Sequence, residues 1–334
     1  MLLANRWYNW HVFSRQLSRE WQQQLAAHYP TSTAASSPIP ADGKMVVSMC
    51  NGWVESGGLV DRLRGIVSTY ILCRESGLPF RLHFTSPFPL ELFLVPNAYD
   101  WCIAPDALRF SQPEATPVAL QVGSESPWQS AKQREWLQRH IRQASGKQVH
   151  VYTNAMFAYG EGFGTAFNEL FRPSERLQQA IDSQLEALGE GYVSVSARFL
   201  GALGDFRDTT SVQPLPHDKQ SQLIEACIGQ IRLIQERHPG KTVLVNSDST
   251  TFLAQAARLP NTYSAPGHIL HLDVPSHADA LYDTYEKTFL DFFLIAHASH
   301  VYRLTTRWMH SSGFPYAASL LYGQPFHSVD FKLS

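Results

Sequence analysis

The sequence has few cysteines and no clustered metal ligands, which argues against a disulfide-rich or zinc-dependent protein. Its four cysteines among 334 residues are scattered, with no Cys-x-x-Cys pair and no spacing typical of a zinc site. The 14 histidines also form no compact ligand cluster along the chain. We therefore expect reduced, mostly buried thiols, an intracellular protein and no metal site.

Net charge and long apolar runs are also scarce. Lys and Arg number 27 against 29 Asp and Glu, so the formal net charge is −2. A nucleic-acid-binding protein would carry a strong basic excess, so we expect no nucleic-acid partner. No apolar run reaches the ~18 residues that span a bilayer, and polar residues interrupt the N-terminal apolar positions, unlike a signal peptide. These absences predict a cytoplasmic enzyme or binding protein without a transmembrane segment.

Residues 1–43 differ in pattern from the rest of the chain. Apolar residues recur there every three or four positions, which predicts an amphipathic helix, and a linker rich in Ser, Thr, Ala and Pro follows from Thr31. The apolar positions are Leu3, Trp7, Trp10, Phe13, Leu17, Trp21 and Leu25. We expect this helix to pack on the body of the protein. Peripheral membrane contact or a partner is the alternative, which Arg6, Arg15 and Arg19 permit.

From Lys44 onward, short apolar runs alternate with longer amphipathic segments, as strands alternate with helices in α/β proteins. The predicted strands are Met45–Met49, Phe80–Phe84, Val118–Val122, Val149–Tyr152, Tyr192–Ser196, Thr242–Asn246, Ile269–Leu272, Val301–Leu304 and Phe326–Val329. The predicted helices are Leu59–Glu75, Ala131–Ala144, Thr165–Leu188 with a break at Pro173 and Ser174, Lys219–Glu236, Thr250–Ala257, Ala280–Ala296 and Gly313–Leu321.

Two such series in succession predict an α/β protein with two Rossmann-like domains, each a doubly wound parallel sheet. We expect the domains to cover residues 44–190 and 191–334, because Gly189 and Gly191 interrupt the helical pattern at the join. Ligands of open parallel sheets bind beyond the carboxyl ends of the strands. A cleft between the two domains is therefore the expected site.

The segment Cys50–Gly65 joins a predicted strand to a predicted helix through a loop that contains Gly52, Gly57 and Gly58. Glycines permit tight turns and close approach of a ligand, and a helix start offers unpaired N–H groups to an anion. Asp61 and Arg62 follow in the first helical turn. An ordinary strand-to-helix turn with surface charges would explain the same residues.

In the second half, Arg198 follows the predicted strand Tyr192–Ser196, and Asp205 comes seven residues later. A guanidinium at the end of a strand can bind a phosphate through two parallel hydrogen bonds. A salt bridge between the domains is the alternative for Arg198.

Two further loops leave strands of the second half. Asp248 stands where a carboxylate could accept hydrogen bonds from a base or a ribose, although Asp248 or Ser249 could instead cap the next helix. Near the end of the chain, Ser311 and Ser312 precede a helix whose N–H groups could hold an anion, and Phe314 could pack on a nucleobase. A simple capping sequence would also account for this loop.

Taken together, the order of these segments resembles the fucosyltransferase superfamily, which includes the α-1,2-, nodulation-type α-1,6- and protein O-fucosyltransferases. The matching features are GGLVDRLRG, a strand that ends in Arg, a strand that ends in Ser-Asp, and SSGF, spaced over most of residues 45–330. The resemblance implies a GT-B architecture, a GDP-fucose donor, a glycan acceptor and inverting transfer without a metal cofactor. The absence of an Asp-x-Asp motif fits the last point.

The resemblance also implies roles for individual residues. The motif beside the donor sugar and the acceptor is matched by Gly57, Gly58, Asp61 and Arg62. Arg198 matches the arginine that contacts the diphosphate, and Asp248 matches the acidic residue of guanine recognition. The last motif, which lies at the phosphate and the nucleotide, is matched by Ser311, Ser312 and Phe314. The chain departs from the family where Ser196 replaces a histidine and where extra residues precede Asp205. Asp61 and Glu55 are the candidates for the general base, with Asp61 first.

Three other functions compete with this one. The chain could be a non-catalytic sugar-nucleotide or glycan-binding relative, or a GT-B transferase with another nucleotide sugar. A nicotinamide-dependent dehydrogenase is disfavoured, because no Gly-x-Gly-x-x-Gly follows the first strand. We expect the loops Thr85–Pro96 and Asn154–Gly164 to set acceptor specificity, with their aromatic residues either stacked on sugars or packed locally.

Overall fold

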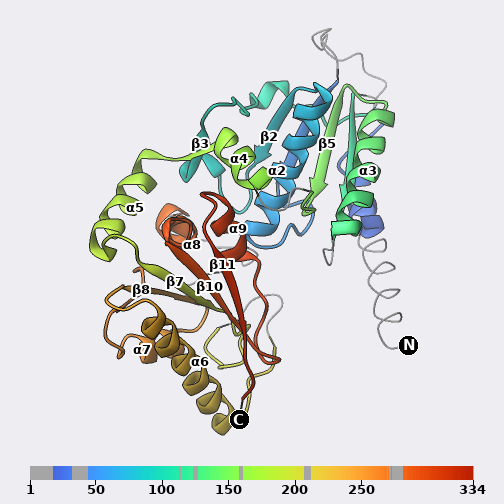
Figure 1. Cartoon of the computed structure of the whole chain (residues 1–334). Coiled ribbons are helices and arrows are strands. Elements are labelled where there is room, and N and C mark those ends of the chain that lie inside the picture. The colour runs from blue at the N-terminus through green and yellow to red at the C-terminus, as the bar shows by residue number, and fades with distance from the viewer. Residues whose placement is uncertain are drawn as a thin grey trace. The chain divides into compact units, whose positions relative to one another are not determined.

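The computed structural model describes residues 18–31, 44–112, 114–122, 127–157, 161–206, 212–268, 270, 272 and 281–333. The chain divides into two compact units (Figure 1). Unit 1 consists of Met1–Leu90 and Val95–Arg172, and unit 2 consists of Glu91–Leu94 and Pro173–Ser334. Each unit holds one parallel sheet with helices packed on it, so the predicted α/β class with two parallel sheets is confirmed.

Unit 1 is built on a four-stranded parallel sheet with the order β2-β1-β5-β4. Its strands are β1 (Met45–Cys50), β2 (Phe80–Phe84), β4 (Ala115–Leu120) and β5 (Gln148–Thr153), and its helices are α2 (Leu59–Ser76), α3 (Pro127–Gln143) and α4 (Glu161–Leu170). Strand β1 has a neighbour on both sides and is buried on both faces, which explains its nearly continuous apolar sequence. Helix α2 ends at Gly77, whose φ of 64° is the left-handed conformation that glycine adopts at helix ends.

A helix at residues 18–26 covers the open edge of this sheet at β4. The Gln22 side chain makes two hydrogen bonds of the kind that a neighbouring strand would make. Its Nε2 donates to the Pro117 carbonyl at 3.2 Å, and its Oε1 accepts from the Ala119 N–H at 3.2 Å. Trp21 and Leu25 are buried in the core of unit 1. The prediction that this helix packs on the body of the protein is confirmed for residues 18–26, whereas Leu3 to Leu17 lie outside the described residues.

Unit 2 is built on a five-stranded parallel sheet with the order β11-β10-β7-β8-β9. Its strands are β7 (Val193–Ala197), β8 (Val243–Ser247), β9 (Thr262–Tyr263), β10 (His300–Thr305) and β11 (Phe326–Asp330). Its helices are α5 (Glu175–Leu188), α6 (His217–Arg237), α7 (Thr250–Ala256), α8 (Leu281–His297) and α9 (Phe314–Leu320).

Two short strands, β3 (Leu94–Pro96) and β6 (Phe171–Pro173), pair separately, and two single 3-10 turns lie at Leu90–Leu92 and Pro105–Ala107.

The structure divides the chain earlier than the sequence predicts. Helix α5, which we assigned to the first domain, belongs to unit 2, so the division falls at Pro173 and not near residue 190. The physical reason is packing: α5 lies on α8, with Leu177 and Ile181 fully buried. Glu91–Leu94 belongs to the same unit, because the Phe93 ring stacks on Phe289 at 4.2 Å.

Two smaller expectations also changed. The predicted strand Ile269–Leu272 lies partly outside the described residues, and the sheet instead takes β9 as its edge strand. Three of the four free thiols are buried as expected, but Cys102 is exposed. None of the described helices has the length and apolar character required to cross a bilayer.

Candidate functional site

The carboxyl ends of three neighbouring strands in unit 2 bring together the loops that the sequence singled out. Leu304 pairs with Ala197, and Ala197 pairs with Ser247, so the loops after β10, β7 and β8 leave the sheet side by side. The His310 N–H donates to the Arg198 carbonyl at 2.9 Å, which ties the first two of these loops together. The structure therefore places Arg198, Asp248 and the Ser311–Ser312 segment on loops at one edge of the sheet.

Asp248 fixes the loop that carries Arg198. The residue is only 8% exposed; one carboxylate oxygen accepts from the Phe199 N–H and the other from the Leu200 N–H, both at 2.8 Å. Burial raises the pKa of Asp248, although these N–H groups and the positive charge of Arg198 act in the opposite direction. Both carboxylate oxygens thus bind main chain, and Arg198, which is partly buried, lies within electrostatic reach of Asp248.

Asp205 caps a helix. One of its oxygens accepts from the Thr251 N–H at 2.7 Å, from the Ser249 hydroxyl at 2.8 Å and from the Thr250 hydroxyl at 3.2 Å. Burial would raise the pKa of Asp205, but these donors outweigh burial and lower it. Ser249 itself accepts from the Phe252 N–H at 3.0 Å, so it is the N-cap of α7.

The Ser311–Phe314 loop leads into the last helix of unit 2, whose N-cap residue is Gly313. The Ser312 hydroxyl accepts from the Phe314 N–H at 3.2 Å, and Arg303 donates to the Ser312 carbonyl at 3.0 Å. The Phe314 ring packs edge-to-face on Phe292 at 5.3 Å. Ser311 is exposed. The Ser312 hydroxyl thus closes a local turn onto Phe314, and the N-cap position of α9, Gly313, has no side-chain cap.

In unit 1, Arg62 organises the glycine-rich loop after β1. The side chain is 5% exposed; its Nε donates to the Gly57 carbonyl at 2.8 Å, and its Nη1 donates to the Ser86 carbonyl at 2.9 Å. Gly57 has a φ of 73°, in the left-handed region where any other residue would be strained, and a Cβ there would also displace the Asp61 side chain, 2.7 Å away. Arg62 thus holds the loop after β1 against the loop after β2.

The two carboxylates predicted as general bases lie in this region. The Asp61 side chain is 40% exposed and pairs with Arg64 at 3.2 Å, and Glu55 is exposed. Gly65, which ends the motif, has a role that we missed: a Cβ there would lie 1.7 Å from the Thr153 carbonyl oxygen. The motif therefore lets α2 pack directly on the main chain at the end of β5.

Sequence reasoning also missed a buried hydrogen-bonded chain behind the glycine-rich loop. The Tyr29 hydroxyl contacts His150 Nδ1 at 2.7 Å and the Tyr152 hydroxyl at 3.1 Å, and Asn51 donates to Tyr152 at 3.4 Å. Burial lowers the pKa of His150 to about 3, so the imidazole is neutral. No local sequence pattern reveals this hydrogen-bonded group, because its residues come from separate segments of the protein.

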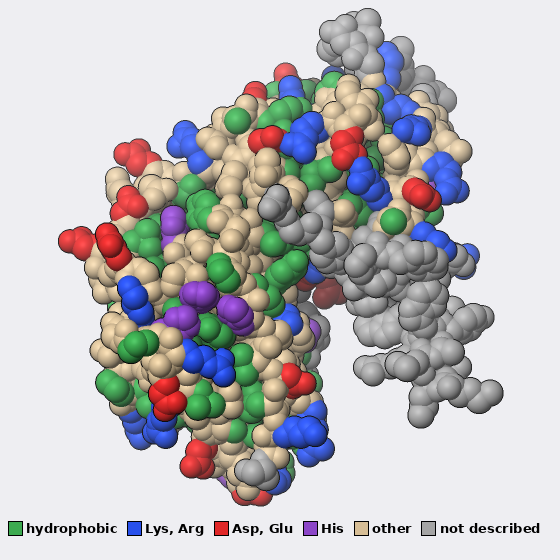
Figure 2. Space-filling view, in the orientation of Figure 1, with side chains coloured by type: hydrophobic (Ala, Val, Ile, Leu, Met, Phe, Trp, Pro, Cys, Tyr) green, Lys and Arg blue, Asp and Glu red, His purple; other side chains and the backbone are tan. Residues whose placement is uncertain are grey.

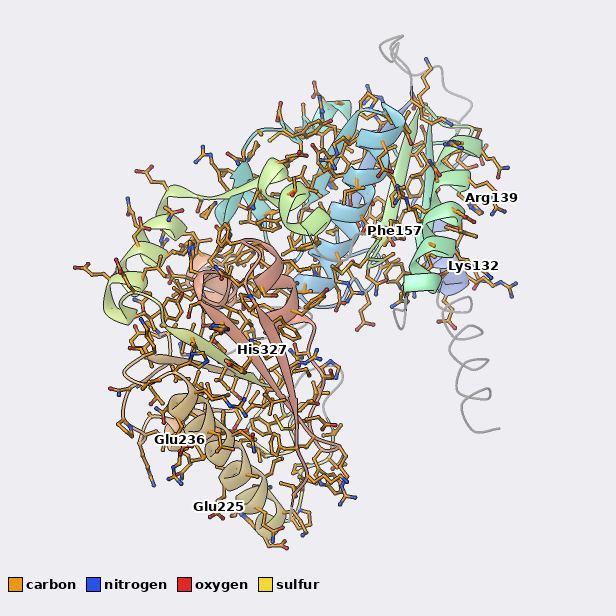
Figure 3. The ribbon with its side chains drawn as sticks, viewed as in Figure 1. Lys132, Arg139, Phe157, Glu225, Glu236 and His327 are labelled. Carbon is orange, nitrogen blue, oxygen red and sulfur yellow. The ribbon has the colours of Figure 1, made fainter. Side chains whose placement is uncertain are left out.

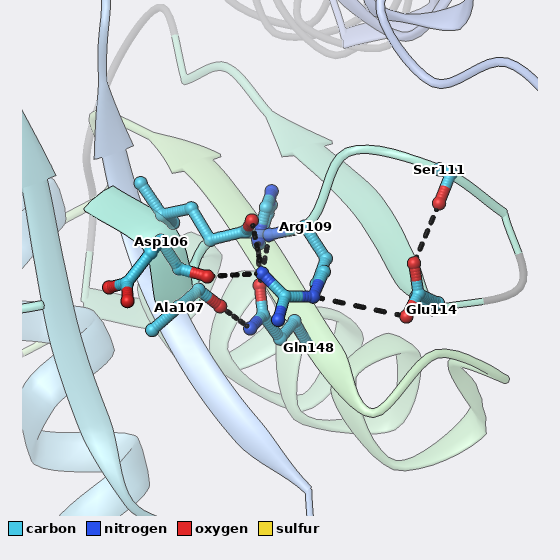
Figure 4. Close-up of polar contacts among 8 residues, drawn as sticks. Asp106, Ala107, Arg109, Ser111, Glu114 and Gln148 are labelled. Atoms are coloured by element: carbon cyan, nitrogen blue, oxygen red, sulfur yellow. Dashed lines mark hydrogen bonds and ion pairs between the residues drawn. The ribbon is translucent and has the colours of Figure 1, made fainter. Parts of the chain in front are cut away.

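Gln148 extends this chain to the segment before β4. Its Oε1 contacts His150 Nε2 at 3.1 Å and accepts from the Arg109 N–H at 3.0 Å, while its Nε2 donates to the Ala107 carbonyl at 2.6 Å (Figure 4). Arg109 also pairs with Glu114 at 3.9 Å. A single buried amide thus links the core of unit 1 to its surface loop.

Among the described aromatic residues of the two predicted acceptor loops, Phe88 packs locally, whereas Phe93 packs on Phe289 of α8. Phe88 is 1% exposed and stacks near Phe84, and Phe93 is fully buried. Phe157, which Figure 3 labels, is partly exposed and its N–H donates to the Ser68 hydroxyl at 2.9 Å. Residues 158–160 of the second loop lie outside the described residues.

Three histidines that lie far apart in the sequence gather on the surface of unit 2, where Figure 2 shows a histidine patch. His300 Nδ1 lies 3.3 Å from His327 Nε2, and the His238 ring lies 4.8 Å from that of His300. Strand pairing brings His300 and His327 together, since β10 and β11 are adjacent, and His238 stands at the end of α6. Within the described parts of the chain, no three His, Cys, Asp or Glu residues are arranged to hold a metal ion.

We compared the sequence and the fold of this chain with those of known proteins. No protein-family model matches the chain. No curated protein matches its sequence. Among solved structures, NodZ α-1,6-fucosyltransferase co-crystallized with GDP has a TM-score of 0.56 at 15% identity, covering 84% of this chain and 93% of that one. Fucosyltransferase NodZ from Bradyrhizobium has a TM-score of 0.55 at 15% identity, with 84% and 94% covered.

A third similar structure is the apo form of POFUT1, with a TM-score of 0.50, 12% identity and coverage of 89% of this chain and 99% of that one. At these identities the similarity concerns the fold. The fold expected from the four motifs is confirmed: this chain has the two-sheet GT-B fold of the fucosyltransferases.

Proposed function

We propose that this chain is a glycosyltransferase that moves fucose from GDP-fucose to a glycan hydroxyl, with inversion and without a metal cofactor. One observation carries the proposal. The loops after β7, β8 and β10 lie side by side and carry Arg198, in a fold shared with a NodZ structure soaked with GDP-fucose (TM-score 0.53, 14% identity). Ligands of parallel sheets bind at such strand ends.

In this proposal Arg198 binds the diphosphate of the donor. As the bond to GDP breaks, negative charge grows on the leaving phosphate, and a guanidinium held in place stabilises it. Asp248 is then a positioning residue, because its two oxygens hold the main chain directly after Arg198. We prefer this role to guanine recognition. Ser311, which is exposed, Ser312 and the start of α9 are proposed to contact phosphate, and Phe314 to lie near the nucleotide.

Unit 1 is proposed to activate the acceptor. The acceptor oxygen attacks the anomeric carbon, the bond from that carbon to the diphosphate oxygen breaks, and a carboxylate takes the hydroxyl proton. Asp61 is our first choice as this base, since it is 40% exposed on the first turn of α2, and Glu55 is the second. Arg62 and Gly57 keep the loop beside Asp61 in shape, and Gly58 is the N-cap residue of α2. A cytoplasmic location remains a prediction from the sequence.

Calorimetry tests the donor site. We expect GDP to bind the wild-type protein more tightly than UDP, ADP or NAD, and Arg198→Ala to weaken GDP binding at least tenfold. Arg232→Ala is the matched control, because that arginine is exposed on α6. Unchanged GDP affinity in Arg198→Ala would remove Arg198 from the site, and tighter binding of UDP would point to another donor.

Turnover tests the reaction itself. GDP release from GDP-fucose is measured across a panel of glycan acceptors, and Asp61→Asn is expected to slow it by about 10²- to 10⁴-fold while GDP binding stays intact. Glu55→Gln serves as the comparison variant. If GDP binds but no acceptor leads to its release, the chain is a non-catalytic sugar-nucleotide-binding relative.

A further inference from the structure

Unit 1 contains a cavity of about 740 Å³ that the proposed transfer reaction does not use. Strand β4 forms its floor, and α3 and the helix at residues 18–26 form its walls. This volume lies within the range of about 300–1,000 Å³ that is typical of small-molecule sites. None of the described lining residues comes from the Cys50–Gly65 motif.

The ionisable side chains among the described lining residues are Arg19, Lys132 and His140, and no carboxylate is among them. Figure 3 shows Lys132 on α3. The residues on both walls thus supply cationic or neutral groups, with Arg19 on the N-terminal helix and Lys132 and His140 on α3. A cavity lined in this way favours an anionic ligand.

The same wall offers an aromatic surface. The Trp136 and His140 rings stack at 3.6 Å with 24° between their planes. His140 Nδ1 lies 2.8 Å from the Trp136 carbonyl oxygen, so Nδ1 carries a proton and donates it there. This hydrogen bond and the ring stacking hold the His140 ring against Trp136. A rigid, partly exposed indole is suited to packing against the C–H face of a sugar ring.

Two amides in the lining have unused hydrogen-bonding capacity. The Oε1 atoms of Gln121 and Gln133 are buried and have no hydrogen-bond partner within the described part of the chain. Buried polar atoms are nearly always paired in folded proteins. Rotation of either amide toward the cavity would let its oxygen accept a hydrogen bond, and a polyhydroxylated ligand supplies several such donors.

From these observations we propose that the cavity binds an acidic saccharide, that is, a sugar chain that carries carboxylate or sulfate groups. The cationic residues select its charge, Trp136 packs on a ring face, and the two glutamines bind hydroxyl groups. This site is separate from the proposed donor site. Binding to this cavity is measured without GDP-fucose, so the test does not require the protein to be an active transferase.

The test is calorimetric titration of the full chain with tetragalacturonate and with a sulfated heparin tetrasaccharide, beside neutral maltotetraose and inorganic phosphate. We expect at least one acidic saccharide to bind at least tenfold more tightly than maltotetraose and phosphate, and saturating GDP to leave its affinity unchanged. Equal binding of maltotetraose, or of phosphate alone, would overturn the proposal. So would failure of both acidic saccharides to bind at millimolar concentration.

Variants locate the site. Lys132→Ala and Trp136→Ala should each weaken binding of the acidic saccharide at least tenfold. Arg139→Ala is the matched control, since Arg139 is an exposed residue of the same helix (Figure 3) and is not among the described lining residues. An equal loss in Arg139→Ala would indicate attraction to the surface of α3 in general and would refute a site in the cavity. Circular dichroism of each variant checks that it is folded.

Discussion

The loops that follow the central strands of the two sheets are held by side chains of opposite charge. In unit 1 the buried guanidinium of Arg62 donates to two main-chain carbonyls, and in unit 2 the buried carboxylate of Asp248 accepts from two main-chain N–H groups. In each case main-chain dipoles offset the cost of burying a charge. A loop at the end of a strand is thus held in shape by a buried positive charge in unit 1 and by a buried negative charge in unit 2.

The two solutions differ in how well they tolerate loss of the charge. A main-chain N–H makes one strong hydrogen bond, whereas a carbonyl oxygen has two lone pairs and is more often left under-satisfied in folded proteins. We therefore expect the loop of unit 2 to depend on Asp248 more strongly than the loop of unit 1 depends on Arg62. This expectation ranks the first variants to be made.

Asp248→Ala should have the largest effect on stability. It leaves two N–H groups without an acceptor, at about 1–3 kcal/mol each, so we expect a loss of about 2–6 kcal/mol. Arg62→Ala should cost less, about 1–3 kcal/mol. Urea unfolding measures both, and hydrogen exchange at Phe199 and Leu200 reports the local change. A larger loss in Arg62→Ala would show that the sign of the buried charge does not decide the outcome.

Acidification should destabilise unit 1 through His150. The pKa of His150 is about 3 in the folded protein, against the ordinary histidine value of 6.5, so below pH 6.5 the unfolded chain takes up a proton that the folded chain does not. The contribution of neutral His150 to the free energy of unfolding is therefore fully present above pH 6.5. It is lost as pH decreases, by up to about 1.4 kcal/mol per pH unit, or about 3 kcal/mol at pH 4.5.

His150→Gln should flatten this pH dependence, with His217→Gln as the control because that side chain is exposed. In unit 2, burial and neighbouring charges lower the pKa of His238 and His327, but both are more open to solvent, so their contribution is smaller. Thermal unfolding between pH 4.5 and 7.5 measures the difference. An unchanged pH profile in His150→Gln would refute the assignment.

Glycine substitutions contrast the close packing of α2 in unit 1 with the open face of α6 in unit 2. Gly65→Ala should cost about 1–3 kcal/mol, because a Cβ would overlap the Thr153 carbonyl and α2 would have to move. Gly229→Ala is the matched control in α6, where a Cβ meets nothing within 4 Å, and it should stabilise the protein by up to about 1 kcal/mol. Melting temperatures of the two variants should therefore shift in opposite directions.

The smallest expected change is that of Asp205→Ala. The substitution removes one cap of the short helix α7 while Ser249 still accepts from Phe252, so we expect a loss of about 1 kcal/mol. GDP affinity should stay within twofold of wild type if Asp205 is only a cap. A tenfold loss of GDP affinity without a matching loss of stability would instead support a role in the donor site.

The strand Phe80–Phe84 and the helical stripe of α2 were predictable to within a residue, because they depend on local periodicity. The candidate site was predictable only as four loops. That Asp248 holds the Arg198 loop, that Asp205 caps α7 and that three histidines meet on unit 2 could not be predicted, since each joins residues far apart in sequence.

Read on its own, the sequence determined the alternation of strands and helices, the two-sheet class and the loops at the strand ends, because each depends on neighbouring residues. Only the tertiary structure decided the strand order, the place of α5 in unit 2 and the partners of each buried charge. The physical reason is that a buried polar group must find its hydrogen bonds wherever the folded chain brings a donor or acceptor within reach.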